Sequence, residues 1–419
     1  MKRGLIALAV AGAFAAPAAM ADVTISGAIN MGLQIGKSSD APANTFSGTP
    51  AVPGLTTNQL HPSYSHIDIE STDDIGNGNK IVFHYQFDIS GTSSAAPNLA
   101  GGAIGNRNSF IGVVGTWGAF KVGTNENVYE RFMYVPDPLD GAVGPGGNLN
   151  ILGTPGVGTV FEVGQAGCAT LGAAFVFDPD TGTNIANPDA GTGGCVGFYR
   201  RAEQQIWYES PNWNGFTFEV DYTLSAFKTQ TIDPQIISIG GKWQPEGMPF
   251  YVDLAIEQHE DMFGANKLGA VGGTGSSDDA LQIGGGWTLG DLSLHARYEQ
   301  LSYKTDGIAA GLISEYERDA YWFAVKYNMP SGYVGAELGI ANEGETNLGD
   351  AVDTGATMFG VGYFHNLSKQ SQLQFIYART DNDANGSYAQ IGSPLAGGGP
   401  STSIGADHQV FDVRIKHTF

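Results

Sequence analysis

The chain has 419 residues, of which 42 % are hydrophobic, 11 % aromatic and 61 glycine, and its formal net charge is −22. This acidic charge argues against a nucleic-acid partner, whose binding needs a basic surface. The absence of an apolar run of helix-spanning length beyond the N-terminal segment excludes a helical membrane protein. The abundance of glycine and aromatic residues favours many short strands joined by turns.

The N-terminal segment is typical of a secretion signal. Lys2 and Arg3 precede an apolar stretch over residues 5–14, and Ala19-Met20-Ala21 matches a small-x-small cleavage site. We therefore expect a signal peptide over residues 1–21 and a mature chain, residues 22–419, that starts at Asp22. An uncleaved anchor is the alternative, and the shortness of the apolar stretch disfavours it.

The mature sequence alternates between apolar and polar residues with a period of two. Over residues 216–224, for example, one face is entirely apolar and the other carries Thr217, Glu219, Asp221 and Thr223. In a soluble sandwich such an apolar face would be buried, whereas in an outer-membrane barrel it would face lipid. Alternation alone does not choose between the two.

About sixteen segments have this strand character, and the lengths of their connections distinguish an outer-membrane barrel from a soluble sandwich. Short links such as 289–290 and 330–332 alternate with long, glycine-rich ones such as 37–62 and 382–407. Short turns on one rim and long loops on the other are typical of outer-membrane barrels. The predicted strands are 23–35, 63–71, 80–90, 106–116, 119–125, 203–210, 215–224, 235–244, 249–258, 279–288, 291–304, 318–329, 333–342, 355–366, 371–381 and 408–419.

Aromatic residues near the strand ends support the same fold. Outer-membrane barrels carry aromatic girdles at both membrane interfaces. The residues that we expect in such girdles are Trp117, Trp207, Trp213, Trp243, Trp287, Tyr321 and Trp322. The sequence therefore predicts an all-β protein, a sixteen-stranded antiparallel transmembrane β-barrel.

The chain contains two cysteines, Cys168 and Cys195, both in a stretch rich in Gly, Asp and Pro. Export permits a disulfide, and a bridge between these two would tie down a long loop. Two free thiols are the alternative. Because no His or CxxC motif lies near them, metal or redox chemistry is not indicated.

Several motifs in order along the chain resemble the Gram-negative general porins. The first strand, Asp22 to Asn30, looks like the first strand of that family, and 106–112 looks like the fourth. Residues 209–216 look like the sixth strand, its turn and the start of the seventh. The last strand, 408–419, ends in Phe419 and resembles the signal read by the barrel-assembly machinery of the outer membrane.

The resemblance implies that the third long loop, about residues 126–202, folds into the lumen and narrows it. In the family, acidic residues on this loop face a basic cluster on the wall. Arg107 matches a wall position, while His66, Glu70 and Thr124 replace residues that are often basic in the family. The resulting candidates for the pore constriction are Arg107, His84, Glu126, Glu130, Asp137 and Asp140.

No catalytic or metal-binding motif is present in the sequence. It has no HExxH, GxSxG, Walker or CxxC motif, so no catalytic residue, metal site or cofactor is predicted. We therefore expect passive diffusion of ions and small hydrophilic solutes through a water-filled pore in the outer membrane of a Gram-negative bacterium. The negative charge favours cations.

The alternatives are a substrate-specific channel, suggested by the long third loop, a barrel enzyme, and an adhesive or structural barrel with a plugged lumen. The expected surroundings are outer-membrane lipid and lipopolysaccharide, with no nucleic acid. The family resemblance further implies a homotrimer.

Overall fold

The computed structural model describes most of the chain from Asp22 onward. The predicted signal peptide, residues 1–21, therefore lies outside the described residues. No helix in the described part of the chain has the length and apolar character that a membrane crossing requires. The described residues are 22–43, 50–89, 107–134, 136–139, 144–156, 175–178, 183–186, 197–199, 201–224, 233, 235–261, 275–307, 310–311, 313–390 and 404–419.

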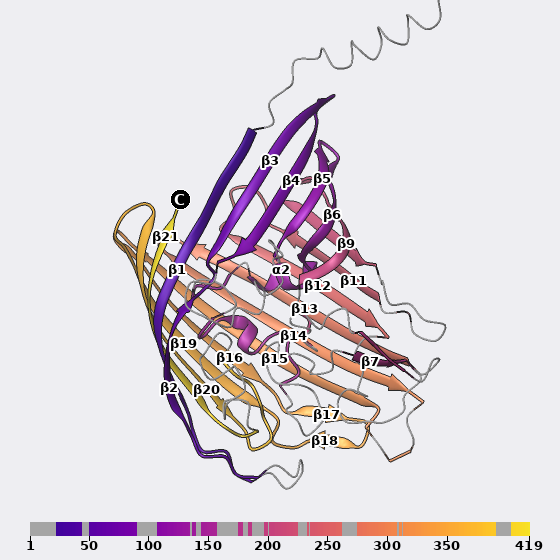
Figure 1. Ribbon diagram of the computed structural model, residues 1–419, viewed down its shortest axis with the longest axis vertical. Helices are drawn as coiled ribbons and strands as arrows, with labels where there is room; N and C mark the ends of the chain where they lie inside the picture. The colour runs from indigo at the N-terminus through magenta and orange to yellow at the C-terminus, as the bar shows by residue number, and fades with distance from the viewer. Residues whose placement is uncertain are drawn as a thin grey trace, which may run out of the picture.

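One antiparallel sheet closes on itself to form a barrel (Figure 1). The first and last strands, β1 (Asp22–Ser38) and β21 (His408–Thr418), pair along Ala28 to Ser38, so the described sheet has no free edge there. β2 (Thr56–Pro62) and β3 (His66–Gly76) follow each other along β1 and form one wall strand.

Counted over the described residues, the wall has sixteen strands, which confirms the predicted barrel. The others are β4 (Asn79–Asp88), β5 (Ser109–Gly115), β6 (Gly118–Glu126), β9 (Arg201–Glu209), β10 (Phe216–Thr223), β11 (Gln235–Trp243), β12 (Phe250–Glu260), β13 (Gly275–Leu289), β14 (Leu292–Asp306), β15 (Glu315–Met329), β16 (Gly332–Ala341), β19 (Ala356–Asn366) and β20 (Ser371–Asn382).

The connections contain the remaining short elements. Between β6 and β9 lie helix α2 (Val128–Tyr134), the 3₁₀-helix η1 (Asn148–Asn150) and a separate hairpin of β7 (Phe175–Asp178) and β8 (Thr183–Ala186). The small hairpin β17 (Gly344–Thr346) and β18 (Gly349–Ala351) lies between β16 and β19.

Burial along the wall strands is the reverse of that in a soluble protein. In β12, Val252, Leu254 and Ile256 are 48 %, 43 % and 43 % exposed, whereas Asp253 and Glu257 are 5 % and 2 % exposed. An apolar outer face suits hydrocarbon, and a polar inner face suits a lumen. This pattern confirms that the apolar face of the alternation is the outer one.

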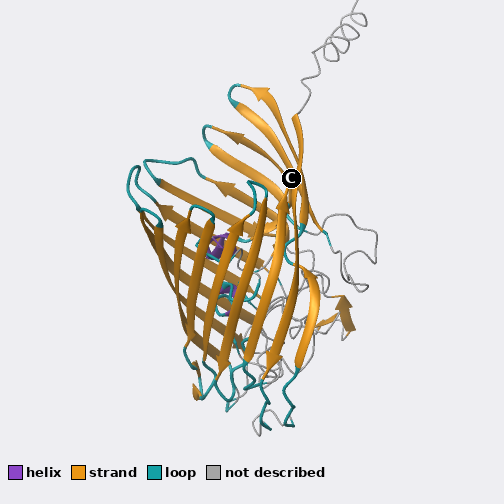
Figure 2. Ribbon diagram, turned by 90° about the vertical axis from the view of Figure 1, so that its left-hand side faces the viewer, coloured by secondary structure: helices purple, strands orange, loops and turns teal. Residues whose placement is uncertain are grey.

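Short turns occupy one rim and long connections the other (Figure 2). The β3–β4 turn is Asn77-Gly78, with φ of 55° and 75°, which is the backbone that a two-residue hairpin turn requires. The hairpins β3–β4 and β5–β6 reach beyond the other turns of this rim (Figure 1). In outer-membrane barrels the rim with short turns faces the periplasm.

The second wall strand begins earlier than predicted. The sequence pattern assigned residues 37–62 to a loop, but β2 pairs with β1 from Met31 opposite Pro62 to Lys37 opposite Thr56. Tyr64, between β2 and β3, has a φ of 47°, which interrupts the strand and its alternation. The prediction was wrong here because pairing with β1, rather than local apolar periodicity, stabilises this segment.

The aromatic girdle is confirmed in part. Trp117, Trp213, Trp243 and Trp287 are 42 %, 49 %, 45 % and 50 % exposed near the short-turn rim. Trp207 and Trp322 are instead buried, at 1 % and 0 %, and the Trp322 Nε1–H donates to Glu337 at 2.6 Å. The prediction for these two was wrong because they stand on the inward face of their strands.

Candidate functional site

Helix α2 is held against the polar face of the wall strands. The first backbone N–H groups of a helix have no acceptor within the helix. Here the Val128 N–H donates to Asp221 Oδ2 at 2.6 Å, and the Tyr129 N–H donates to Ser238 Oγ at 2.8 Å. The helix therefore depends on side chains of β10 and β11 for its N-terminal hydrogen bonds.

Residues 151–154 are bound by a buried ion pair between β14 and β15. Arg318 and Glu299 lie 2.8 Å apart and are both fully buried. Arg318 donates to the carbonyl oxygens of Ile151 (3.0 Å) and Thr154, while Glu299 accepts from the Gly153 N–H (2.8 Å). The pair thus attaches the connection between β6 and β9 to the wall at several backbone groups.

Tyr129 joins this attachment to helix α2. Its hydroxyl donates to Glu299 at 2.9 Å. Burial, together with the neighbouring Glu299 carboxylate, raises the pKa of the Tyr129 phenol well above its ordinary value. The phenol therefore stays protonated and remains a donor at physiological pH.

Glycines on the inward face of the strands make room for the connection. A Cβ added at any of four of them would press against a side chain of residues 132–151 at distances that packed atoms do not tolerate. The pairs, with the distance from the added Cβ to the nearest atom of that side chain, are Gly240–Phe132 (2.7 Å), Gly335–Pro138 (2.8 Å), Gly339–Ile151 (2.8 Å) and Gly360–Leu139 (2.6 Å).

Two of the predicted acidic residues belong to this connection. Asp137 accepts hydrogen bonds from the backbone N–H groups of Leu139 (2.8 Å) and Asn148 (3.0 Å), so it organises the bend between α2 and η1. Glu130 lies in α2 and is 4 % exposed. Asp140 lies outside the described residues.

Two other predicted residues, Arg107 and His84, share a hydrogen-bonded network on the wall. Arg107 Nε donates to Gln86 Oε1 at 2.9 Å, and Gln86 Nε2 donates to Asp68 Oδ1 at 2.7 Å. His84 Nε2 lies 2.9 Å from the same Asp68 oxygen. This network connects β3 and β4 with the residues just before β5.

Glu126 lies beside this network at the end of β6. It pairs with Arg201 at 2.5 Å, and Arg201 Nε also donates to Asn108 Oδ1 at 2.8 Å. The Arg107 guanidinium lies 4.5 Å from the centre of the Tyr64 ring and interacts electrostatically with Glu126. Arg107, His84 and Glu126 thus come together, whereas Glu130 and Asp137 lie elsewhere along the connection.

Sequence reasoning missed several members of this site. Arg201 stands at the first position of β9, and its charge next to an acidic loop was the available signal. Asp68 alternates with Ile67 and Ile69, so the period of β3 marks it as inward-facing. The strand glycines had no comparable signal, because their role depends on the path of another segment.

Buried carboxylates outnumber buried arginines in the described part of the chain. Three of the arginines are paired, with Arg297–Asp253 at 2.8 Å, Arg318–Glu299 at 2.8 Å and Arg414–Asp412 at 2.6 Å. The four buried arginines are Arg107, Arg297, Arg318 and Arg414. The nine buried carboxylates are those of Asp68, Glu130, Asp221, Asp253, Glu257, Asp278, Glu299, Glu337 and Asp412.

Cys168 and Cys195 lie outside the described residues, so their pairing stays a prediction. Among the residues that are described, no group of three or more His, Cys, Asp or Glu side chains is placed to hold a metal ion.

Comparison with known proteins agrees with the architecture. The sequence profile of Gram-negative porins matches residues 7–385. The outer membrane porin protein 32 of Delftia acidovorans is 25 % identical over 427 residues, covering all of both chains. The major outer membrane protein P.IB of Neisseria meningitidis is 35 % identical over 131 residues, which are 30 % of this chain and 35 % of that protein.

Solved structures show the same fold at low sequence identity. An anion-selective porin from Comamonas acidovorans superposes with a TM-score of 0.65 at 17 % identity, covering 95 % of this chain and all of the other. A trimer form of OmpT from Vibrio cholerae gives a TM-score of 0.58 at 13 % identity and covers 95 % and 99 % of the two chains. The chain therefore belongs to the family of Gram-negative porins and is a channel protein of the outer membrane.

Proposed function

We propose that this channel passes ions and small hydrophilic solutes by passive diffusion, with a preference for cations. The observation that carries the preference is the acidic composition of the chain, 42 Asp and Glu against 20 Lys and Arg, which recurs among the buried residues of its described part as nine carboxylates against four arginines. Fixed charge in a narrow passage with low-dielectric walls concentrates counterions. Because a porin with the same fold is anion-selective, the sign of the ion selectivity is the property to test.

We further propose that residues 126–156 narrow the lumen. This proposal is supported by the contacts of α2, Arg318 and the strand glycines with the polar face of the wall. The constriction would lie between this segment and the Arg107 network. In this arrangement Arg107, His84 and Glu126 set the local electric field. Glu130, Asp137 and Asp140 would add negative charge or keep residues 126–156 in position.

Several properties of the mature protein follow from the family and belong to the same proposal. The chain would lose residues 1–21 on export and fold as one barrel over residues 22–419. Phe419, whose backbone N–H and carbonyl bond to Gly27, would be read by the assembly machinery. A homotrimer is supported by the trimeric OmpT form, and lipid with lipopolysaccharide would surround it. A bridge between Cys168 and Cys195 would constrain the long connection.

A liposome-swelling experiment tests passive diffusion. Uncharged sugars of increasing size should enter at rates that fall smoothly with size and show no saturation. Saturation by one solute, or competition between solutes for ion current, would favour a substrate-specific channel. No swelling by folded protein would favour a plugged adhesive or structural barrel. The relatives named above are porins, and hydrolase activity of the folded protein would be needed to support a barrel enzyme.

A further inference from the structure

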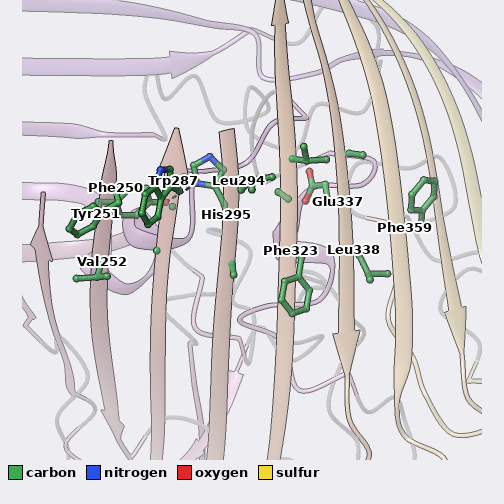
Figure 3. A pocket seen from close by; sticks show the side chains of 16 residues that line it. Phe250, Tyr251, Val252, Trp287, Leu294, His295, Phe323, Glu337, Leu338 and Phe359 are labelled. Carbon is green, nitrogen blue, oxygen red and sulfur yellow. Dashed lines mark hydrogen bonds between the residues drawn. The ribbon is translucent and has the colours of Figure 1, made fainter. Parts of the chain in front are cut away.

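The connection between β6 and β9 follows the inner wall from β10 toward β20. Its contacts begin at Asp221 on β10 and pass to Glu299 on β14 and Arg318 on β15. They continue on β16, where Glu337 shares a side-chain hydrogen bond with Asp137 (Figure 3). The last described part of this path is the stretch that ends at residue 156.

A second connection, between β20 and β21, meets this stretch. Each of residues 387–390 in that connection is at most 4 % exposed, and we call these four residues the strap. The Ser387 N–H donates to the Gly156 carbonyl at 2.8 Å. The Gly146 N–H donates to Gln390 Oε1 at 2.7 Å. The strap thus bonds to the first connection near both ends of residues 146–156.

The strap is itself fixed to the barrel. Gln390 Nε2 donates to Thr380 Oγ1, on the inward face of β20, at 2.6 Å. Asn382, the last residue of β20, accepts from the Tyr388 N–H at 2.8 Å and donates to the Tyr388 carbonyl at 2.8 Å. The strap therefore links residues 146–156 to β20 through hydrogen bonds on both of its sides.

The Tyr388 ring closes the contact with Gly156. This glycine has a φ of 65°, and a Cβ added there would overlap the fully buried ring. Next to it, the Pro155 carbonyl accepts a hydrogen bond from the Tyr316 hydroxyl of β15 at 2.9 Å. The bend at residues 155–156 is therefore held between β15 and the strap.

Residues 144–156 already lie as close to the wall as their backbone allows. A Cβ added at Gly339 on β16 would lie 2.8 Å from Ile151, and one at Gly360 on β19 would lie 3.1 Å from the Gly146 Cα. Since closer approach to these strands would make packed atoms overlap, a displaced segment moves toward the interior of the barrel. Loss of the strap would then obstruct the pore.

We propose that the strap keeps the pore open, with Tyr388 and Gln390 as positioning residues that hold residues 144–156 against the wall. This inference rests on the proposed function, in which residues 126–156 narrow the lumen. It adds a second connection that determines how far the lumen is narrowed. The two connections cooperate although Gly146 and Gln390 are 244 positions apart in the sequence.

The test is the frequency of closures in single-channel recordings in potassium chloride. Tyr388→Ala removes the ring, and Gln390→Leu removes the acceptor of the Gly146 N–H. Both variants should keep the wild-type open level but close about tenfold more often, the factor expected when a buried donor loses its acceptor. Tyr388→Phe retains the ring and should close as rarely as the wild type. Tyr377→Ala is the matched control, because Tyr377 stands on the outer face of β20, between the buried Ile376 and Ala378.

Gly156→Ala tests the same contact from the other side. Its methyl group overlaps the Tyr388 ring, so this variant should close as often as Tyr388→Ala. In Gly156→Ala/Tyr388→Ala the ring is gone, and closures should be no more frequent than in Tyr388→Ala alone. Such non-additivity is expected of residues in contact, and additive closures would contradict the contact.

Hydrogen exchange of residues 144–156 gives a readout that needs no conduction, and heat-dependent gel migration checks that each variant is folded. The Gly146 amide should exchange about tenfold faster in Gln390→Leu than in the wild type. Closures of Tyr388→Ala as rare as those of Tyr377→Ala would overturn the strap, as would wild-type exchange in Gln390→Leu. A folded protein that never conducts, yet shows the faster exchange, would contradict the proposed function and leave the attachment by the strap in place.

Discussion

Arg318 attaches residues 151–154 to the wall through two backbone carbonyls, so we predict that Arg318→Met loosens this segment. Its guanidinium bonds to the carbonyls of Ile151 and Thr154 and pairs with Glu299, and both charged side chains are fully buried. Methionine retains much of the apolar stem and removes the charge. The carbonyls lose their donor, and Glu299 is left as a buried carboxylate without its arginine.

Removing one partner of a buried ion pair costs about 3–5 kcal/mol. Most of this cost comes from the carboxylate that is left behind, so adding Glu299→Gln should recover a large part of it. The Gly153 and Tyr129 donors can still bond to the glutamine carbonyl, and a neutral side chain is cheaper to bury. Arg318→Met/Glu299→Gln should therefore be more stable than Arg318→Met alone.

Open-channel current noise and limited proteolysis measure the attachment directly. We expect Arg318→Met to show larger current fluctuations and faster cleavage between β6 and β9, with the barrel itself intact by heat-dependent gel migration. Arg379→Met is the matched control, because the Arg379–Asp381 pair is 42 % and 49 % exposed and should contribute little. Equal noise and cleavage in Arg318→Met and Arg379→Met would refute the reasoning.

Five further substitutions, at four positions, probe the same region. Gly339→Val should force Ile151 away from the wall at a cost of about 1–3 kcal/mol, and a single-channel conductance equal to that of the wild type would contradict the predicted displacement. Asp137→Ala should leave two backbone N–H groups without their acceptor, at a cost of about 1 kcal/mol each, and limited proteolysis should then cut the β6–β9 connection faster. Asp137→Asn keeps one oxygen acceptor and should therefore lose less stability than Asp137→Ala. Arg107→Gln should increase cation preference and Glu126→Gln should decrease it, both measured as zero-current potentials, and shifts of the same sign would rule out this electrostatic assignment.

Much of the barrel could be predicted from the sequence because the wall strands are specified locally. The alternation in segments such as β12 and β14 follows from lipid on one side and a polar lumen on the other, and the turns are marked by residues such as Asn77 and Gly78. β2 was missed because it depends on its neighbour β1 more than on its own pattern. Trp207 and Trp322 were misassigned because the position of a tryptophan near a strand end does not show which face of the strand its side chain occupies.

The candidate site could be predicted less completely, because it depends on where a long connection runs. Arg107 and Glu126 were found next to strands whose registers are clear, and the structure brings both into one neighbourhood. Asp137 carries a charge that suits a pore, yet it accepts hydrogen bonds from the backbone of its own segment and shares a side-chain hydrogen bond with the buried Glu337 of β16. Gly339 and Gly360 matter only because Ile151 and Leu139 contact them, and such pairing has no local signature.

The zero-current potential of purified protein in a planar bilayer under a potassium chloride gradient tests the central claim most directly. A carboxylate-rich lumen predicts stepwise conductance with a potential of the sign that potassium flow produces, and a smaller magnitude at high salt because the fixed charges are screened. Stepwise conductance with a potential of the chloride sign would contradict the cation preference while leaving the porin fold in place.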